Sequence, residues 1–484
     1  MLTQTIGKLI RVGKHRVGRF QLDPDLGSEH NYNVAKSWLE DCCTLHKNCP
    51  GKATVKLPTR VIDVGTLDEL QGPRLFLSED IEASYVALSH CWGGVVSQML
   101  MTDTLETFKD VIPLSSLPAN FQDAISITRH LGIQYLWIDT LCIIQDSKDD
   151  WEAESKKMGS IYRNALVTIS AATACRSTDG ILRCSPGSKT SRGAIPLKIS
   201  TDNKSHDTVQ VSLKDEEEES LGSLFSTSPL NKRGWTLQER VLSPRVLYYG
   251  KRQIYWQCRQ GFRSADEVPD GALMPEQVSY PEISNLLHFH SLNQPSTGKL
   301  DLYLLLDEYY KLVHEYSSRK LSFDSDKLPA FSGLASLLHP VLGGDYLAGI
   351  WSEDFRQGLF WYDELGECRH TLSDQAPSWS WTVTNDPVLF DSTGHKGGIS
   401  PDHAQLLGHN LELRNQNIYG PVHSGHLIIE GLTKKLLRSS QSINFVDEGI
   451  ARVYFDEPEV GNIDETHPNL FEVEVDGERG GCLL

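Results

Sequence analysis

The sequence lacks several features that would place it in a broad protein class at once. Its 484 residues contain no apolar run of about 18 residues or more, which excludes a transmembrane helix. Lys and Arg number 46 against 64 Asp and Glu, for a net charge of −18, whereas binders of nucleic acid or anionic membranes need a basic surface. No Gly-x-Gly-x-x-Gly phosphate loop and no internal repeat is present. We therefore expect a globular protein that binds neither nucleic acid nor membranes.

A secretory signal is also missing from the sequence. The first 20 residues are basic, but they contain no apolar run followed by a cleavage site. Ten cysteines are scattered along the chain, a pattern typical of reduced thiols rather than of a disulfide framework. These observations predict a cytosolic or nuclear compartment, and of the two we expect the protein to be cytoplasmic.

The negative charge is unevenly distributed. From Asp447 to Arg479 there are 11 acidic residues and 2 arginines, a net of −9, so this segment carries half of the total imbalance. A second acidic run covers five consecutive carboxylates at 215–219. Blocks of like charge are usually solvated, and we expect no binding site in either of them.

The strongest structural pattern lies between residues 84 and 172. Short apolar runs at 84–90, 135–144 and 166–172 predict buried strands, and residues 117–132 and 149–165 have the periodicity of helices. We expect the second helix to be capped by Asp149 or Asp150. Strand and helix alternating with short links predict a βαβαβ unit with parallel strands and right-handed crossovers.

Four regions are expected from the remaining patterns. They are an N-terminal lead with a helix and short strands (1–80), an α/β core (81–260), a helical region (261–350) and a β-rich, acidic C-terminal region (351–484). In the last region, Trp379 and Trp381 alternate with serines as in a strand.

Unusual polar residues follow two of the predicted core strands. In an open parallel sheet ligands bind beyond the carboxyl ends of the strands, so the two loops are expected to share one rim. The loops read Ser89-His90-Cys91-Trp92-Gly93-Gly94 and Asp139-Thr140-Leu141-Cys142-Ile143-Ile144-Gln145-Asp146. Glu152 and Glu154 are expected in the first turn of the next helix, at the same rim.

These motifs carry a family resemblance. The segments YVALSHCWGG, LPANFQDAISITRHLGIQYLWIDTLCIIQD, DWEAESKKMGSIYRNALVTISAA and RGWTLQERVLSPRVLYYG occur here in sequence order. Together they resemble the heterokaryon-incompatibility (HET) domain of filamentous fungi. The resemblance implies a fungal protein of non-self recognition and programmed cell death, with an α/β core distantly similar to the Toll/interleukin-receptor (TIR) fold.

Because some TIR domains cleave NAD with a catalytic glutamate, the resemblance also suggests NAD as a substrate, with no cofactor. Glu154 is the first catalytic candidate because it matches the family's W-x-x-E-x3-M pattern, and Asp139 is the second. A carboxylate stabilises the oxocarbenium-like centre that forms when a glycosidic bond breaks. The candidate substrate-binding residues are Ser89, Trp92, Gly93, Cys142 and Gln145.

Each candidate also has a structural interpretation. Trp92 and Gly93 suit a packed turn, Asp139 suits a loop cap, and Glu154 suits a partner of the helix dipole. Cys142 could serve as a small buried apolar side chain. Gln145 could hydrogen-bond backbone amides in a tight turn. Two other functions therefore stay open: a non-enzymatic module that signals through protein partners or self-assembly, and an accessory enzyme of a biosynthetic pathway.

Two further clusters have mainly structural interpretations. Arg233, Trp235, Gln238, Glu239 and Arg240 favour an arginine–carboxylate brace. Cys42, His46 and Cys49 fall on one helix face at i, i+4 and i+7. Their types suit zinc, but no fourth ligand lies nearby in the sequence. The pattern favours a thiol-lined packing surface, so no metal ligand is assigned, and whether the three residues bind metal stays open.

Overall fold

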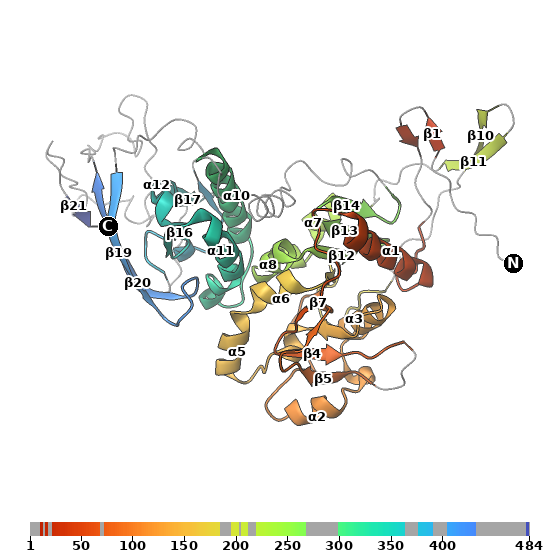
Figure 1. Ribbon diagram of the computed structural model, residues 1–484, viewed down its shortest axis with the longest axis horizontal. Coiled ribbons are helices and arrows are strands. Elements are labelled where there is room, and N and C mark those ends of the chain that lie inside the picture. Colours follow the sequence, from red (N-terminus) through yellow and green to blue (C-terminus); the bar gives the residue numbers. More distant parts are fainter. Residues whose placement is uncertain are drawn as a thin grey trace, which may run out of the picture. The chain divides into compact units, whose positions relative to one another are not determined.

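The computed structural model describes most of the chain in two compact units (Figure 1). Unit 1 is drawn from Met1–Asn231 and Glu239–Asn285, and unit 2 from Lys232–Gln238 and Leu286–Leu484. The described residues are 10–12, 15–17, 22–67, 72–183, 195–202, 205–211, 219–267, 299–363, 376–390, 404–431 and 481–483. The acidic segment Asp447–Arg479 lies outside them, as does most of the acidic run at 215–219.

Unit 1 is built on one eight-stranded mixed sheet with the order β14-β13-β12-β9-β7-β8-β4-β5. β7 pairs in parallel with β8 and β9, and β9 with β12, while the strand pairs at both edges are antiparallel. The predicted parallel unit is therefore confirmed. The strands are β4 (Arg60–Asp63), β5 (Arg74–Leu77), β7 (Tyr85–Ser89), β8 (Tyr135–Trp137), β9 (Val167–Ser170), β12 (Arg245–Tyr249), β13 (Ile254–Cys258) and β14 (Gly261–Ser264).

The central strands are apolar because both faces of the sheet are covered. Every residue of β7, β9 and β12 is buried, and Val86, Leu88 and Ile169 are fully excluded from solvent. A parallel strand that is covered on both faces reads as a continuous apolar run rather than an alternating one. That is why three short apolar runs were enough to predict which segments of this core are strands.

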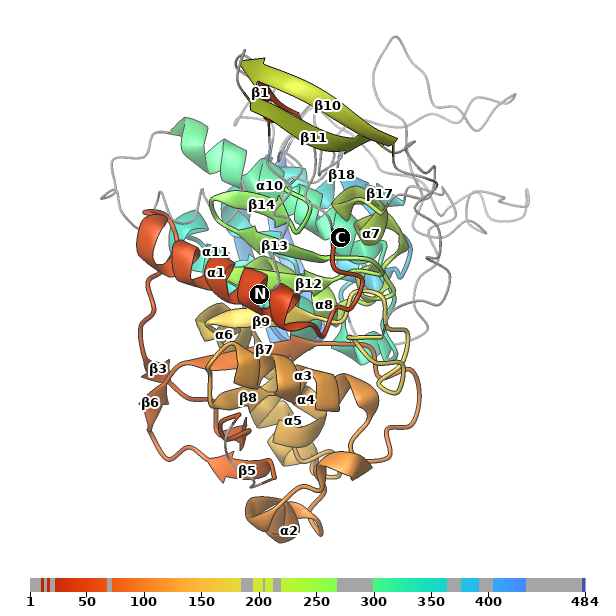
Figure 2. The ribbon, with the colours of Figure 1, turned by 90° about the vertical axis from the view of Figure 1, so that its right-hand side faces the viewer.

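Helices lie on both faces of the sheet. Figure 1 shows α1 and α3 on one side and α5 and α6 on the other, and Figure 2 shows α1 lying along β13, which it contacts. The helices of unit 1 are α1 (Glu29–Leu45), α2 (Leu105–Asp110), α3 (Ala119–His130), α4 (Asp139–Cys142), α5 (Lys148–Ser155), α6 (Met158–Asn164) and α7 (Leu221–Thr227). α8 (Trp235–Leu242) begins in residues of unit 2 and ends in residues of unit 1.

Several boundaries differ from the sequence predictions. The expected strand 135–144 ends at Trp137, because the apolar run continues into the short helix α4. The expected helix 149–165 is two helices, α5 and α6, and its cap is Ser147, whose hydroxyl accepts from the Asp150 amide, rather than Asp149 or Asp150. The shift matters for the site, because it moves Glu154 from a first turn to a last turn.

Three small antiparallel pairs complete unit 1. β10 (Ile195–Asp202) and β11 (Ser205–Val211) form an antiparallel hairpin. The other pairs are β1 (Ile10–Val12) with β2 (His15–Val17), and β3 (Val55–Lys56) with β6 (Glu82–Ala83).

Unit 2 surrounds an aromatic core. The rings of Tyr309, Phe331, Trp351 and Trp381 meet edge to face. Trp379 and Trp381 are buried, but SWSW is not a strand, because η6 (Trp381–Val383) is a 3-10 turn.

The described helices of unit 2 are α10 (Lys299–Ser317), α11 (Pro329–Leu342) and α12 (Phe355–Leu359), and its described strands are β15 (Tyr346–Leu347), β16 (Ile350–Trp351), β17 (Trp361–Asp363), β18 (Val388–Phe390), β19 (Ala404–Leu413), β20 (Val422–Gly431) and β21 (Gly481–Leu483). The C-terminal part is thus β-rich. None of the helices in the described residues is long and apolar enough to cross a membrane.

Candidate functional site

Polar residues gather where the parallel strands of unit 1 end. Ser89 is the last residue of β7, Ser170 is the last residue of β9, and Asp139 follows β8 after one residue. Because the three strands are parallel, their carboxyl ends lie on one edge of the sheet, where α/β proteins bind ligands. The first and second predicted loops therefore do share a rim.

Asp139 is the centre of this rim. Its Oδ1 lies 3.0 Å from His90 Nε2 and accepts from the Thr140 amide at 2.7 Å and from the Thr140 hydroxyl at 3.0 Å. Its Oδ2 accepts from Trp92 Nε1 at 2.8 Å. One carboxylate thus joins the loop after β7 to the start of α4.

These contacts hold Asp139 in its ionised form. Burial alone would raise the pKa of Asp139. The charge and hydrogen bond of His90, with the N–H groups of Trp92 and Thr140, outweigh burial and lower the pKa to about 2. The His90 side chain is itself buried and packs edge to face on Phe121. Asp139 therefore suits a fixed negative charge and does not suit a general acid at neutral pH.

Ser89 meets a carboxylate that the sequence analysis did not place at this rim. The Ser89 hydroxyl donates to Glu239 Oε2 at 2.5 Å, and both side chains are buried. The Glu239 carbonyl in turn accepts from Ser243, whose hydroxyl is 2.6 Å from that of Thr168. The chain positions of Ser89 and Glu239 are 150 apart, so only the folded sheet reveals the pair.

Glu154 lies at the other end of α5 from the rim. It is in the last turn of the helix, which corrects the expected first-turn position. Glu154 Oε1 accepts from Thr59 Oγ1 at 2.8 Å and from Lys157 Nζ at 2.9 Å, and the residue is only 2% exposed. Among the described residues no hydrogen bond joins Glu154 to Asp139 or His90. The two carboxylates proposed for catalysis thus belong to separate hydrogen-bond networks.

Comparison with known proteins identifies this core. The family model of the heterokaryon incompatibility protein (HET) matches residues 85–239, from the start of β7 to the glutamate that pairs with Ser89. The chain contains a HET domain. No curated protein and no solved structure matches the chain.

Within the HET domain, Trp92 and Gly93 lie in the loop after β7 and pack against the loop after β9. Gly93 has φ +70°, and a Cβ at this position would lie 2.4–2.6 Å from the Cα, Cβ and Cγ atoms of Arg176. Trp92 is half-buried, and its carbonyl accepts from the Ser177 amide at 3.2 Å. The loops after β7 and β9 are therefore packed against each other, and glycine is required at 93 for both conformation and space.

Cys142 and Gln145 have structural roles in the second loop of this rim. Cys142 is buried, and burial raises the pKa of its thiol to about 12. Gln145 Nε2 donates to the carbonyls of Asp139 and Ile143 at 3.1 and 2.9 Å. The thiol stays protonated at neutral pH, and the Gln145 amide is committed to two backbone carbonyls.

An arginine upstream of the matched segment organises the same loops. Arg60 in β4 donates through Nε to the Cys142 carbonyl at 2.7 Å and through Nη2 to both Asp150 oxygens at 2.5 and 2.7 Å. Asp150 also accepts from the Ile144 amide at 2.8 Å. The sequence signal for this brace is an arginine inside the apolar run LPTRVIDV, because a buried arginine needs an acceptor.

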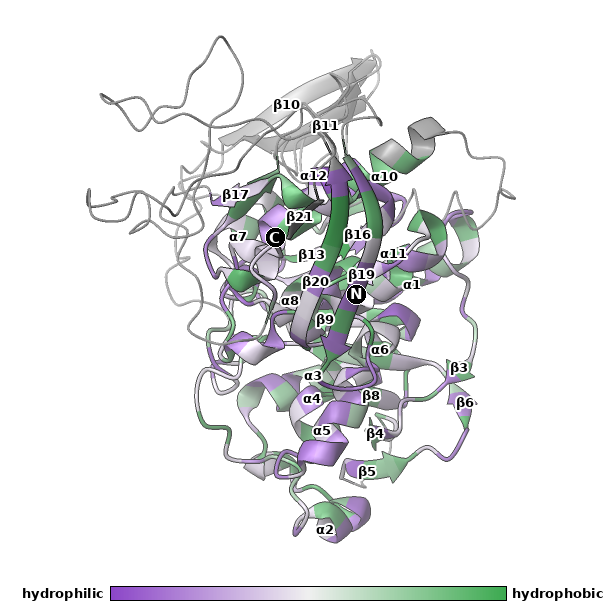
Figure 3. Ribbon diagram, turned by 90° about the vertical axis from the view of Figure 1, so that its left-hand side faces the viewer, coloured by the Kyte–Doolittle hydropathy of each residue, from purple (hydrophilic) through white to green (hydrophobic). Residues whose placement is uncertain are grey.

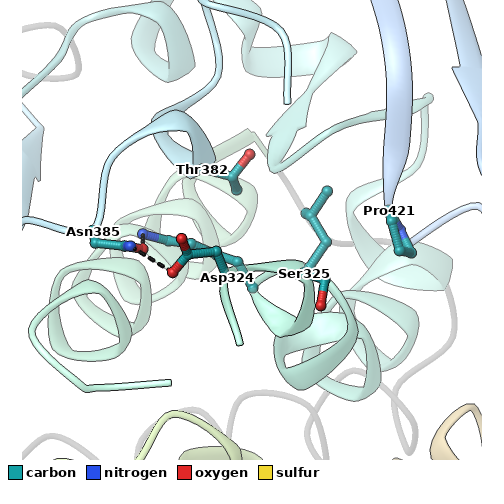
Figure 4. Close-up of a pocket in the computed structure, with 7 residues that line it drawn as sticks. Asp324, Ser325, Thr382, Asn385 and Pro421 are labelled. Atoms are coloured by element: carbon teal, nitrogen blue, oxygen red, sulfur yellow. Dashed lines mark hydrogen bonds between the residues drawn. The ribbon is translucent and has the colours of Figure 1, made fainter. Parts of the chain in front are cut away.

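A small cavity in unit 2, outside the HET domain, is lined by Asp324, Thr382 and Asn385 (Figure 4) and by a buried lysine, Lys327. Its volume of about 10 Å³ has room for roughly one water molecule. Lys327 Nζ donates to the Thr384 carbonyl and lies 3.4 Å from Asn385 Oδ1. Burial lowers the Lys327 pKa to about 7, although Asp324 and Asp386 oppose that shift.

Proposed function

We propose that this chain is an effector of fungal non-self recognition and that its HET domain triggers programmed cell death. Membership of residues 85–239 in the HET family supports the proposal. Two polar pairs at the carboxyl ends of the parallel strands, Ser89 with Glu239 and His90 with Asp139, support it further, because Ser89, His90 and Glu239 are buried and Asp139 is half-buried. Burying polar and charged groups costs free energy even when they are paired, so their concentration at one edge points to a functional surface.

The bonding of this network favours a signalling module over an enzyme. Asp139 accepts four hydrogen bonds from His90, Trp92 and Thr140. Those bonds fix the loops after β7 and β8 in one arrangement. We infer that the rim presents a fixed recognition surface to a protein partner or to a second copy of the chain, and that death follows from assembly.

NAD cleavage is a second candidate, because one observation favours it. Helix α5 is largely hydrophilic (Figure 3), yet two of its residues, Glu154 and Ser155, are buried. A carboxylate buried on a polar helix is the kind of group that could stabilise an oxocarbenium-like centre. In this mechanism α5 has to move so that Glu154 reaches the substrate, because its Oε1 is held by Thr59 and Lys157.

One expression experiment tests the effector function and separates the two mechanisms. The full chain, Asp139→Asn and Glu154→Gln are each expressed from an inducible promoter in a fungal host. Viability and cellular NAD are followed together, and protein accumulation is measured by immunoblot. The matched control is Glu152→Gln, which removes a carboxylate from the same helix where the side chain is 38% exposed and pairs only loosely with Lys148 at 3.8 Å.

We expect the wild-type chain and the Glu152 variant to kill the cells, and the Asp139 variant to be inactive. In the signalling mechanism Glu154→Gln still kills and NAD falls only after viability is lost. In the enzymatic mechanism NAD falls first, and Glu154→Gln abolishes both effects. Survival of cells that accumulate soluble wild-type protein would overturn the effector proposal itself.

A further inference from the structure

A cluster of three buried thiols and one half-buried imidazole lies away from the rim in unit 1. Cys42 comes from α1, His46 caps the C-terminus of that helix, Cys49 follows in the next turn, and Cys258 is the last residue of β13. The four ligand atoms all lie within 4.8 Å of one another. The folded chain therefore supplies the fourth ligand that is absent from the local sequence around Cys42, His46 and Cys49.

The spacing of these atoms fits a tetrahedral metal centre. Zinc binds thiolate at about 2.3 Å and imidazole at about 2.0–2.1 Å, so the edges of its tetrahedron are about 3.8 Å between sulfurs and about 3.6 Å between sulfur and nitrogen. His46 Nδ1 lies 3.5 Å from Cys258 Sγ and 3.8 Å from Cys49 Sγ. The same ring nitrogen faces both sulfurs, as a shared ion between them requires.

A buried arginine beside the cluster also requires a negative charge there. Arg245 is 1% exposed, and its Nε donates to Cys42 Sγ at 3.1 Å. Its other partners are the carbonyls of Leu166 and Pro50, which carry no formal charge. A buried guanidinium needs a counter-charge. Zinc with three thiolates and one neutral imidazole carries a net charge of −1 and would provide it.

One further group lies beside the sulfurs. The backbone amide of Gln260 is hydrogen-bonded to the thiols of Cys49 and Cys258. N–H groups directed at ligand sulfurs are a regular feature of metal sites. A surface built only for thiol packing has no need of this donor.

We propose that Cys42, His46, Cys49 and Cys258 bind one structural Zn²⁺ ion. Four protein ligands close the coordination sphere, so the ion is structural rather than catalytic. Three ligands precede the HET match and one follows it, because the match covers residues 85–239. The ion would therefore tie α1 to β13 and hold together the two flanks of the domain.

The test measures metal in the full chain, purified without added metal or chelator. Inductively coupled plasma mass spectrometry gives zinc per chain for the wild type, Cys258→Ser and the matched control Cys43→Ser. Cys43 lies next to Cys42 on α1 but outside the cluster. Zinc is then removed with a chelator and replaced by Co²⁺, whose absorption reports thiolate ligation and tetrahedral geometry. His46→Cys keeps four ligands and shows whether position 46 binds the ion.

We expect about one zinc per chain in the wild type, Cys43→Ser and His46→Cys, and less than about 0.2 in Cys258→Ser. The Co²⁺ form of the wild type should show thiolate-to-metal charge transfer. If Cys258→Ser does not fold, the zinc content and the Co²⁺ spectrum of the wild type still show whether the chain binds a metal ion through thiolates. Wild-type protein with less than about 0.1 equivalent of zinc and no thiolate–Co²⁺ band would overturn the site. Equal zinc loss from the Cys43 and Cys258 variants would overturn the ligand assignment.

Discussion

Replacing Asp139 by asparagine removes one negative charge from the rim and keeps the shape of the side chain. The pKa of Asp139 falls from its ordinary value of 3.8 to about 2 in the folded chain, which corresponds to about 2 kcal/mol of stability at neutral pH. Because the folded pKa is lowered, this stability is present above about pH 4 and is lost as pH falls towards 2. The new amide also places a donor against either His90 or Trp92, which costs about 1–3 kcal/mol more if one is left unpaired.

Since such terms are not additive, we expect Asp139→Asn to lower the free energy of unfolding by about 2–4 kcal/mol at pH 7. Urea unfolding of the full chain, followed by circular dichroism, measures the change. Asp146→Asn is the control. Its carboxylate is in the same loop but exposed, and within the described part of the chain it accepts only from Thr102, at 2.9 and 3.0 Å. If Asp139→Asn costs no more than the control, or the difference does not shrink below about pH 4, the electrostatic account of the rim is wrong.

Three further predictions concern the loop at Gly93, the thiol of Cys142 and the buried Lys327. Gly93→Ala should destabilise the chain clearly more than Gly132→Ala in thermal unfolding, because both residues have φ near +70° but a Cβ meets neighbouring atoms only at 93; equal losses would mean that Arg176 moves freely aside. Cys142 should resist iodoacetamide at pH 8 while exposed Cys175 reacts, because burial raises the Cys142 pKa to about 12; peptide mass spectrometry would detect alkylation of Cys142 and so contradict this. The buried Lys327 has its pKa lowered to about 7, so the unfolded chain binds the extra proton between about pH 7 and 10 and stability rises with pH there. In Lys327→Met that rise, about 4 kcal/mol at most, should be absent from urea unfolding curves recorded across this range, and an unchanged slope would refute it.

The alternation of strands and helices in the core could be predicted from the sequence because the signals for these elements are local. Buried parallel strands appear as short apolar runs, and the helix 117–132 has a regular apolar face that reappears as α3. The prediction failed where one apolar run served two elements. Residues 135–144 were predicted as one strand, but the strand ends at Trp137, and the amides of Leu141 and Cys142 bond the Ile138 carbonyl in the short helix α4.

The candidate site was harder to predict because its contacts are not local. Sequence position placed Ser89 and Asp139 at strand ends, and the structure confirms those positions. Nothing in the sequence pairs Ser89 with Glu239, or Arg60 with Asp150, since each pair is joined only when the sheet forms. Cys258 is likewise 209 positions from Cys49 and reaches it only through β13, so its role as a fourth ligand had no local signal.

The order of strands in the sheet has a practical consequence for any laboratory fragment of this protein. β4 and β5 come from before the matched segment and pair next to β8, while β12, β13 and β14 come from after it and pair next to β9. A fragment cut to residues 85–239 would retain the three central strands and lose the neighbours on both sides. Its two bare, apolar strand edges would invite intermolecular pairing and aggregation. The smallest fragment that keeps all eight strands of the sheet runs from before Arg60 to after Ser264.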